Sequence, residues 1–180
     1  MSDLVDKILA IDAALDAAGV PHAFGGALAL AWCTERARGT IDIDCNVFVE
    51  PAKVLWVFDA LPDGIAWDDA SVTGVIRDGQ VRLWWDATPV DVFLDTGPFH
   101  ADVATRVRRK PLGGRDIPFL SCSDLAVFKA FFNRTKDWAD LEDMAANGSL
   151  DVDRVAATLE RYLGADDDRI AQLRELAPTP

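Results

Sequence analysis

Two aspartates spaced one residue apart, Asp42 and Asp44, lie in a segment where acidic and apolar residues alternate. Between Ile41 and Val49 the apolar positions share one face and the acidic positions share the other, which is the pattern of a β-strand. Two carboxylates on one face of a strand repel each other unless a cation lies between them. Mg²⁺ prefers oxygen ligands and is typically held by one or two carboxylates together with substrate phosphates. The pair alone indicates either an acidic, solvent-facing edge strand or a Mg²⁺ (or Mn²⁺) site that acts on a phosphate-bearing substrate, and neighbouring features must decide between them.

The same spacing recurs at Asp151/Asp153 and at Asp166/Asp168. These pairs lie near predicted helix starts or in a loop, where aspartates cap helices and favour the positive end of the helix dipole. Only the pair at 42 and 44 is therefore interpreted as a candidate for chemistry.

A glycine pair upstream of the aspartates supplies a second feature suited to phosphate. Gly25 and Gly26 stand where a short strand predicted over 20–24 gives way to a helix predicted over 27–37. Glycine lets bare backbone approach a ligand closely, and the N–H groups at a helix start attract anions. Because the Asp pair follows one helix later, the turn predicts a seat for a polyphosphate beside the metal.

The run from His22 to Leu30, His-Ala-Phe-Gly-Gly-Ala-Leu-Ala-Leu, with Arg-Gly-Thr-Ile-Asp-Ile-Asp at 38–44, resembles the signature of the polymerase-β-like nucleotidyltransferases. The resemblance is to the small bacterial branch that includes AbiEii-like proteins, toxin-type nucleotidyltransferases and minimal antibiotic-modifying relatives. It implies that the glycine turn holds a nucleoside triphosphate (NTP) and that the Asp pair binds metal. Arg38 and Thr40 match the family pattern as nucleotide-binding residues. Alternatively, Thr40 only starts the strand and Arg38 pairs with acidic neighbours.

The resemblance further implies a third carboxylate on a later strand, which binds metal and draws the proton from the attacking hydroxyl. Asp91 fits, because 90–94 alternates as a strand with Asp91 among its polar positions. Asp95 stands at the strand end and Asp86 precedes Pro89, so both are poorer choices. Gly26 stands where the branch often has serine, so phosphate contacts there come from backbone N–H groups.

The residues from Ile117 to Lys129 and from Arg134 to Leu141 resemble the helical segment of the AbiEii-like group. This implies that Lys129 reaches the triphosphate and that Asp137 supports the site. Spacing alone equally allows a lysine whose stem packs on an amphipathic helix while its ammonium reaches water. Asp140 either caps its helix or pairs with Arg134.

Periodicity and turn residues predict the elements that position these side chains. Helices are expected at 4–18, 51–61, 98–105 and 121–132, the last capped by Ser121, and from 136 onward with breaks at 147–148 and 164–168. Asp78-Gly79, between β-rich runs at 72–77 and 80–85, predicts a hairpin. The fold class is α+β, a nucleotidyltransferase (polymerase-β-like) mixed sheet flanked by helices. An α/β core at 1–120 and a C-terminal helical segment at 121–180 form one domain.

Composition and charge limit the number of domains, the partners and the localisation that can be expected. The chain has 180 residues, half of them apolar, which suits one packed domain. Its net charge of −12 disfavours binding of nucleic acid over a broad surface, because the charge repels phosphates. The basic run from Arg106 to Lys110 is a solvated face or a local contact with nucleic acid. No apolar run is long enough to span a membrane, and the acidic N-terminus is unlike a secretory signal, so a cytoplasmic protein is expected.

The cysteines and histidines offer little further chemistry at the level of sequence. Cys33, Cys45 and Cys122 are far apart and odd in number, which predicts buried thiols rather than a disulfide framework or a zinc knuckle. His22 and His100 form no pair with metal-ligand spacing, so a metal here is expected to be hard and oxygen-bound.

These features together predict an enzyme that moves a nucleoside monophosphate (NMP) from an NTP to a hydroxyl acceptor, with loss of pyrophosphate. The acceptor is left open among a tRNA 3′ end, a protein hydroxyl and a small drug, and a toxin-type protein would have a cognate antitoxin. The alternatives are a non-catalytic module that binds a nucleotide or partner and a structural partner protein. Three converging carboxylates favour the enzyme.

Overall fold

The structure, a computed structural model, describes residues 4–36 and 39–177. The candidate residue Arg38 lies outside these described residues. The described chain divides into two compact units, one of residues 4–28 and 39–120 and the other of residues 29–36 and 121–177. The first unit contains the sheet, whereas the second is helical.

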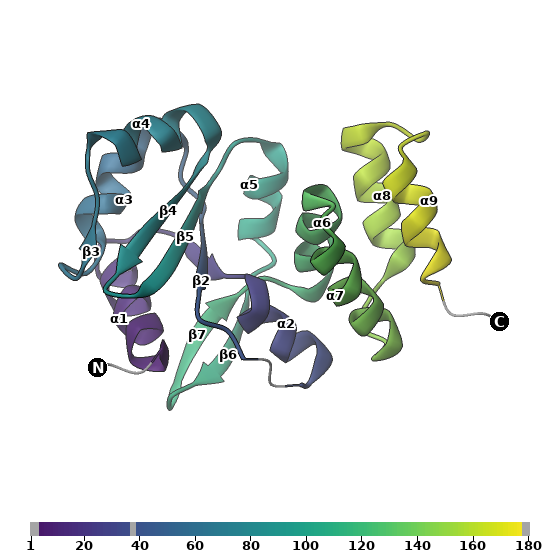
Figure 1. The fold of residues 1–180 in the computed structure, drawn as a ribbon, viewed down its shortest axis with the longest axis horizontal. Coiled ribbons are helices and arrows are strands. Elements are labelled where there is room, and N and C mark those ends of the chain that lie inside the picture. Colours follow the sequence, from purple (N-terminus) through teal and green to yellow (C-terminus); the bar gives the residue numbers. More distant parts are fainter. Residues whose placement is uncertain (1–3, 37–38, 178–180) are drawn as a thin grey trace. The chain divides into compact units, whose positions relative to one another are not determined.

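The first unit is built on a mixed sheet, which has seven strands within the described residues, in the order β3-β4-β5-β2-β1-β7-β6. Strand β2 runs parallel to β5 and β1 parallel to β7, while the other neighbours are antiparallel. Figure 1 shows β4, β5 and β2 at the centre of this unit. The strands are β1 His22–Phe24, β2 Ile43–Val47, β3 Ile65–Ala66, β4 Gln80–Trp85, β5 Thr88–Leu94, β6 Arg108–Leu112 and β7 Arg115–Phe119. The predicted mixed sheet flanked by helices is confirmed.

Helices connect the strands of this unit. They are α1 Leu4–Ala17, the 3₁₀ turn η1 Pro51–Lys53, α3 Val54–Ala60, α4 Asp69–Asp78 and α5 Pro98–Ala104. Helix α2, Gly26–Thr34, begins in the first unit, and its residues from 29 onward belong to the second. Helices α1 and α3 contact each other, as do α3 and α4, and α4 also contacts β4.

One face of the central strands is apolar and fully buried. On β2 and β5 it consists of Ile43, Cys45, Val47, Val90, Val92 and Leu94. Because successive side chains of a strand point to opposite faces, the alternate residues Asp44 and Asp91 lie on the other face. The apolar pattern therefore anchors the strands through one face and leaves the carboxylates on the other.

The hairpin predicted at Asp78-Gly79 is wrong, because the residues before Gly79 form helix α4. Asp68 caps this helix by accepting a hydrogen bond from the Ser71 backbone N–H, and the Ser71 hydroxyl accepts from the Asp68 N–H in return. Gly79 ends the helix in the left-handed conformation, with φ of 71°, which glycine adopts without strain. Local capping thus outweighs the β-propensity of the residues between the caps.

The hairpin that does form joins β4 to β5. Trp85 pairs with Thr88, so the loop consists of Asp86 and Ala87, and Asp86 has a positive φ of 53°. Such a short loop sets the register of the two strands along their whole length.

The strand that contains Asp44 and the helix after Pro51 are also shorter than predicted. Strand β2 covers 43–47 rather than 41–49, so Asp42 precedes it. The helix expected from Pro51 begins as the 3₁₀ turn η1 and becomes α-helical at Val54. The face on which the aspartate pair was placed is unaffected by this shortening, because Asp44 stays within β2.

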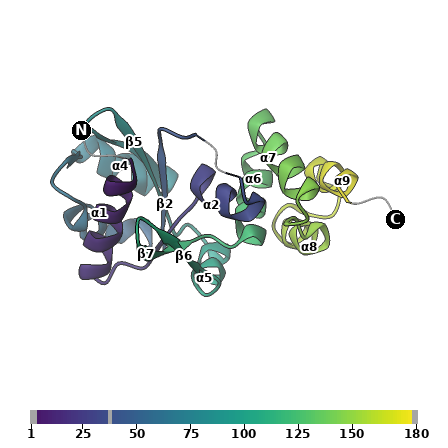
Figure 2. The same cartoon turned by 90° about the horizontal axis from the view of Figure 1, so that it is seen from below.

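The second unit contains four helices after residue 120, as its described residues show: α6 Cys122–Phe132, α7 Thr135–Ala146, α8 Val152–Leu163 and α9 Asp168–Glu175. Figure 2 shows α6, α7, α8 and α9 grouped together, and α6 contacts both α7 and α8. Ser121 caps α6 as predicted, because its hydroxyl accepts a hydrogen bond from the Asp124 N–H. The predicted breaks at 147–148 and 164–168 also separate helices here.

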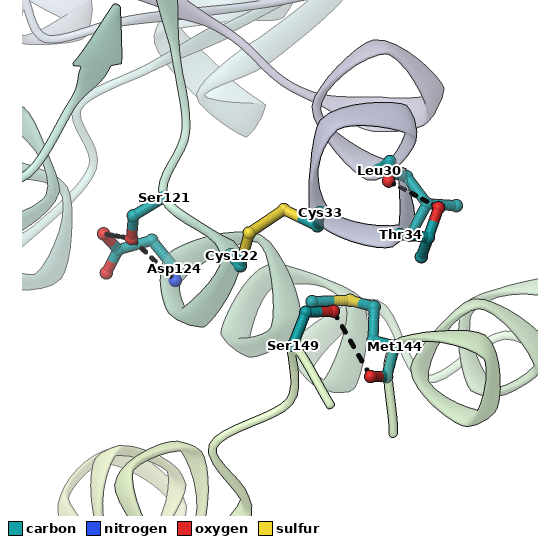
Figure 3. Close-up of a disulfide and its surroundings, with 8 residues drawn as sticks. All are labelled: Leu30, Cys33, Thr34, Ser121, Cys122, Asp124, Met144 and Ser149. Atoms are coloured by element: carbon teal, nitrogen blue, oxygen red, sulfur yellow. Dashed lines mark hydrogen bonds between the residues drawn. A yellow bond between two sulfur atoms is a disulfide. The ribbon is translucent and has the colours of Figure 1, made fainter. Parts of the chain in front are cut away.

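The expectation of three buried thiols is wrong. Cys33 at the end of α2 and Cys122 at the start of α6 form a disulfide, with Cα atoms 5.6 Å apart (Figure 3). The two cysteines are 89 residues apart in sequence, so no local sequence pattern predicts the disulfide. Cys45 is the free and buried cysteine of the described residues. Its pKa is raised to about 12, first by burial and then by the charges of Asp12 and Asp44.

Candidate functional site

Asp44 and Asp91 lie directly opposite each other on neighbouring parallel strands. In the register of β2 and β5, Asp44 is the Cα partner of Asp91. Paired residues of adjacent parallel strands point to the same face, and the strands are about 4.8 Å apart. The structure therefore brings two of the three candidate carboxylates together on the face opposite the apolar core.

Asp42 stands just before β2, two residues from Asp44. Its carboxylate accepts a short hydrogen bond from the hydroxyl of Thr40. The same hydroxyl accepts a longer bond, 3.4 Å, from the Asp42 backbone N–H. Thr40 thus holds the Asp42 carboxylate within its own turn, and that contact is the role the structure gives Thr40.

The glycine pair lies against the carboxylate of Asp44. The Gly25 N–H donates to the Asp44 carbonyl at 2.9 Å, which ties the turn to β2. A β-carbon on Gly26 would stand 1.8 Å from Oδ2 of Asp44, and Gly26 has a positive φ of 53°. Only glycine therefore fits this position without moving the carboxylate. Gly26 is also the first residue of α2, where the N–H groups have no acceptor within the helix.

Arg82 on β4 is the residue of this site that sequence reasoning missed. Its guanidinium forms a bidentate ion pair with Asp91, with Nε 2.7 Å from Oδ1 and Nη2 2.6 Å from Oδ2. Arg82 and Asp91 are Cα partners across the β4–β5 ladder. The sequence signal was available, because the loop at Asp86 and Ala87 places residue 82 opposite residue 91. The misplaced hairpin at Asp78-Gly79 concealed it.

The charges of all three aspartates act on Arg82. Its pKa is raised above the ordinary value, first by the hydrogen bonds and charge of Asp91 and then by the charges of Asp42 and Asp44. The Arg82 side chain is half exposed, whereas Asp91 is largely buried. One guanidinium thus provides positive charge near enough to interact with all three carboxylates.

The donor set suits a hard divalent cation, although the carboxylates are not gathered around one point. A group of three metal-binding side chains with ligand atoms within 4.8 Å of one another is found in the described residues at Asp12, Asp16 and His22, and not at the aspartates of this site. Thr40 holds Asp42 and Arg82 holds Asp91. The side chains supply carboxylate oxygens alone, the ligands that Mg²⁺ and Mn²⁺ prefer. Because Gly26 has no side chain, the Asp44 carboxylate lies directly against the backbone at the start of α2, and the residues fit such an ion.

The group at Asp12, Asp16 and His22 lies on the opposite face of the sheet. His22 pairs with Val47 across β1 and β2, and Val47 shares the buried face. The Asp12 side chain is fully buried, with His22 Nε2 3.2 Å from Oδ1 and Arg115 Nη2 3.5 Å from Oδ2. His22 Nδ1 lies 3.0 Å from the Val20 carbonyl oxygen. Asp12 thus lies between the His22 ring and the Arg115 guanidinium, while its Oδ2 accepts no hydrogen bond from the described residues.

Lys129 and Asp137 belong to the second unit. The side chains of Lys129 and Asp140 are both about nine-tenths buried, and the ammonium donates to the Asp140 carboxylate at 2.6 Å. Asp137 accepts hydrogen bonds from the backbone and the guanidinium of Arg134. Asp140 therefore pairs with Lys129, whereas Arg134 pairs with Asp137. Of the two alternatives for Lys129, the one in which its ammonium reaches water does not hold, because the side chain is buried.

Comparison with known proteins identifies the fold. Neither a protein-family model nor a curated protein sequence matches the chain. Among solved structures, the antibiotic-resistance factor ANT(2'')-Ia in solution is similar with a TM-score of 0.62 and 16% identity, over 88% of this chain and 92% of that chain. ANT(2'')-Ia in complex with adenylyl-2''-tobramycin has a TM-score of 0.62 and 15% identity, over 95% and 97% of the two chains. The chain therefore has the fold of the nucleotidyltransferases, as predicted.

In residues 4–36 and 39–177, none of the helices combines the length and the apolar composition that crossing a membrane requires.

Proposed function

We propose that this protein transfers an NMP from an NTP to a hydroxyl acceptor and releases pyrophosphate. The observation that carries the proposal is the pairing of Asp44 with Asp91 across β2 and β5, with Gly26 packed against the Asp44 carboxylate. The nucleotidyltransferase fold of the chain agrees with this reaction.

Asp42, Asp44 and Asp91 would hold the divalent cation, which when bound neutralises phosphate charge and orients the triphosphate. The N–H groups at the start of α2, next to Gly26, are placed to receive phosphate oxygens. In the reaction the acceptor oxygen forms a bond to the α-phosphorus, and the α–β phosphoanhydride bond breaks. Asp91 takes the hydroxyl proton as general base.

The acceptor that we propose first is a small cationic molecule with a free hydroxyl. The chain carries a net charge of −12 and has a pI of about 4.4, which attracts cations and repels the phosphates of RNA. One of the solved structures of ANT(2'')-Ia contains adenylyl-2''-tobramycin. The basic residues Arg108, Arg109 and Lys110 are exposed on β6 at the sheet edge, so tRNA is retained as a second acceptor for testing. A protein hydroxyl is the third, as in a toxin-type protein with a cognate antitoxin.

The experiment is transfer of radiolabel from each of the four α-labelled NTPs, with Mg²⁺ or Mn²⁺, to an aminoglycoside panel, bulk tRNA or the protein itself. We expect labelled product with at least one acceptor. Asp44→Asn should lower the rate by about 10²-fold or more, because a charge that stabilises the transition state is lost. Asp59→Asn makes the same chemical change on an exposed position of α3 and should leave the rate unchanged.

Each outcome separates the alternatives. Label on the aminoglycoside supports the first acceptor, while label on tRNA or on protein replaces it. Nucleotide binding without transfer under any of these conditions would identify a binding module instead of an enzyme. Equal transfer rates for Asp44→Asn and Asp59→Asn would show that the Asp44 carboxylate has no role in the reaction.

A further inference from the structure

The Arg82 guanidinium binds Asp91, one of the three carboxylates proposed to hold the metal, and interacts with the charges of the other two. Its bidentate bonds of 2.7 and 2.6 Å engage both oxygens of Asp91, in the planar fork geometry that arginine forms with carboxylates. A divalent cation uses the same oxygens as ligands. The two cations therefore cannot both engage Asp91 in full.

The register of the sheet places Arg82 directly opposite Asp91. Arg82 and Asp91 are partners across β4 and β5, while Asp91 and Asp44 are partners across β5 and β2. Three consecutive strands thus place a cation and two carboxylates in one row on one face. The half-exposed guanidinium can swing toward solvent without disturbing the apolar core.

The present arrangement matches a site whose cation is the guanidinium. The oxygens of Asp42, Asp44 and Asp91 are not gathered within 4.8 Å of one another, and the Asp91 carboxylate is turned to Arg82. Neutralisation by Arg82 limits the repulsion between adjacent aspartates while no metal is bound. Gathering the three carboxylates around a metal requires that the Arg82 contact be released.

We propose that Arg82 is a resident counter-cation of the aspartate site, and that a divalent cation binds by displacing its guanidinium from Asp91. This inference rests on the proposed function and deepens it. Arg82 is a positioning residue: it holds Asp91 before metal arrives and sets the metal concentration at which the site fills. Once released, its charge stays beside the site, where it can pair with a phosphate oxygen of the nucleotide.

The test measures Mn²⁺ binding to the full-length protein by titration calorimetry, in four variants. Arg82→Gln removes the competing charge and should tighten Mn²⁺ binding by about three- to tenfold, the range expected for losing a partly exposed charge-assisted pair. Arg77→Gln is the matched control, because Arg77 is an exposed arginine on α4 that pairs with Asp78, and its affinity should stay within about twofold of wild type. Asp44→Asn should abolish binding.

Arg82→Lys separates the specific contact from simple charge. Lysine keeps the positive charge but cannot form the two parallel bonds, so its Mn²⁺ affinity should lie between those of wild type and Arg82→Gln. Displacement also has a direct signal in the wild-type protein. The Arg82 Nε–H resonance, assigned by its loss in Arg82→Lys, should exchange slowly with water before Mg²⁺ is added and faster afterwards.

The results distinguish this inference from the proposed function. If Asp44→Asn abolishes Mn²⁺ binding but Arg82→Gln binds no tighter than wild type, the counter-cation role is wrong and the metal site stands. If Asp44→Asn binds as wild type does, or if no variant binds, both ideas fail. Binding that appears only in Arg82→Gln supports the inference in its strongest form. Thermal unfolding of each variant checks that it is folded.

Discussion

The Asp44 carboxylate lies in the space that a side chain on Gly26 would occupy, with Oδ2 only 1.8 Å from an ideal β-carbon. This contact joins the start of α2 to strand β2. It also explains why position 26 is glycine rather than the serine that the resemblance leads one to expect: any side chain there would overlap the Asp44 carboxylate. The phosphate-binding and metal-binding parts of the proposed site are thus linked by one close approach.

Gly26→Ala should therefore disable the site. The methyl group would push the Asp44 carboxylate away, and alanine would be strained at a φ of 53°. We expect a loss of stability of about 1–3 kcal/mol, measured by urea unfolding, and loss of NMP transfer. Gly74→Ala is the control, because a β-carbon there meets nothing within 4 Å in the middle of α4. It should stabilise the protein by about 0.4–1 kcal/mol. Full activity of Gly26→Ala would contradict the close approach.

Thiol counting tests the pairing of the cysteines. A thiol reagent should find about one reactive cysteine in the denatured, unreduced protein and three after reduction, since Cys33 and Cys122 are bonded. Three reactive thiols without reductant would exclude the disulfide. Peptide mapping of the unreduced protein should recover the fragment that joins residues 33 and 122.

Cys45 should be inert in the folded protein. Burial raises its pKa to about 12 from 9.0, so at pH 9 the thiolate fraction is lower by roughly 500-fold than for an exposed thiol. Alkylation by iodoacetamide at pH 9 should be slower than in denaturant by about 10²-fold or more. The folded state binds this proton more tightly than the unfolded state does. Its contribution to stability is therefore complete below pH 9 and is lost as pH rises toward 12.

The disulfide should stabilise the second unit. Closing a loop of this length typically contributes about 2–4 kcal/mol by limiting the unfolded chain. Reductant should lower the free energy of unfolding of wild type in urea by that amount and leave that of a Cys33→Ser, Cys122→Ser double variant unaffected. An identical shift in both proteins would show that the reductant acts elsewhere.

The buried pair of Lys129 and Asp140 separates a structural lysine from a phosphate-binding one. Asp140→Asn should cost about 3 kcal/mol, the lower end for an unpaired buried charge, because Asp137 remains 4.0 Å from the ammonium. Glu142→Gln, on an exposed position of the same helix, should cost almost nothing. Replacing both partners, Lys129→Met with Asp140→Leu, should restore most of the stability. If the restored protein keeps its NTP affinity, Lys129 has no part in binding the triphosphate.

Much of the fold was readable in the sequence, because the relevant interactions are local. Alternation placed Asp44 and Asp91 on the face opposite the buried residues of their strands, and the Ser121 cap located the start of α6. The prediction of a hairpin at Asp78-Gly79 failed because the residues before Gly79 are compatible with either a strand or a helix. The capping hydrogen bonds of Asp68 and Ser71 favoured the helix. Propensity alone ranked these two alternatives wrongly.

By itself, the sequence determined which residues can carry oxygen-ligated metal chemistry and which face of each strand they occupy, because side-chain alternation is a property of a single strand. Only the tertiary structure decided which strands are neighbours. That choice set Asp91 beside Asp44, turned Arg82 onto Asp91, and joined Cys33 to Cys122 across 89 residues. Such contacts depend on sheet register and packing between distant segments, and no local pattern of residues encodes them.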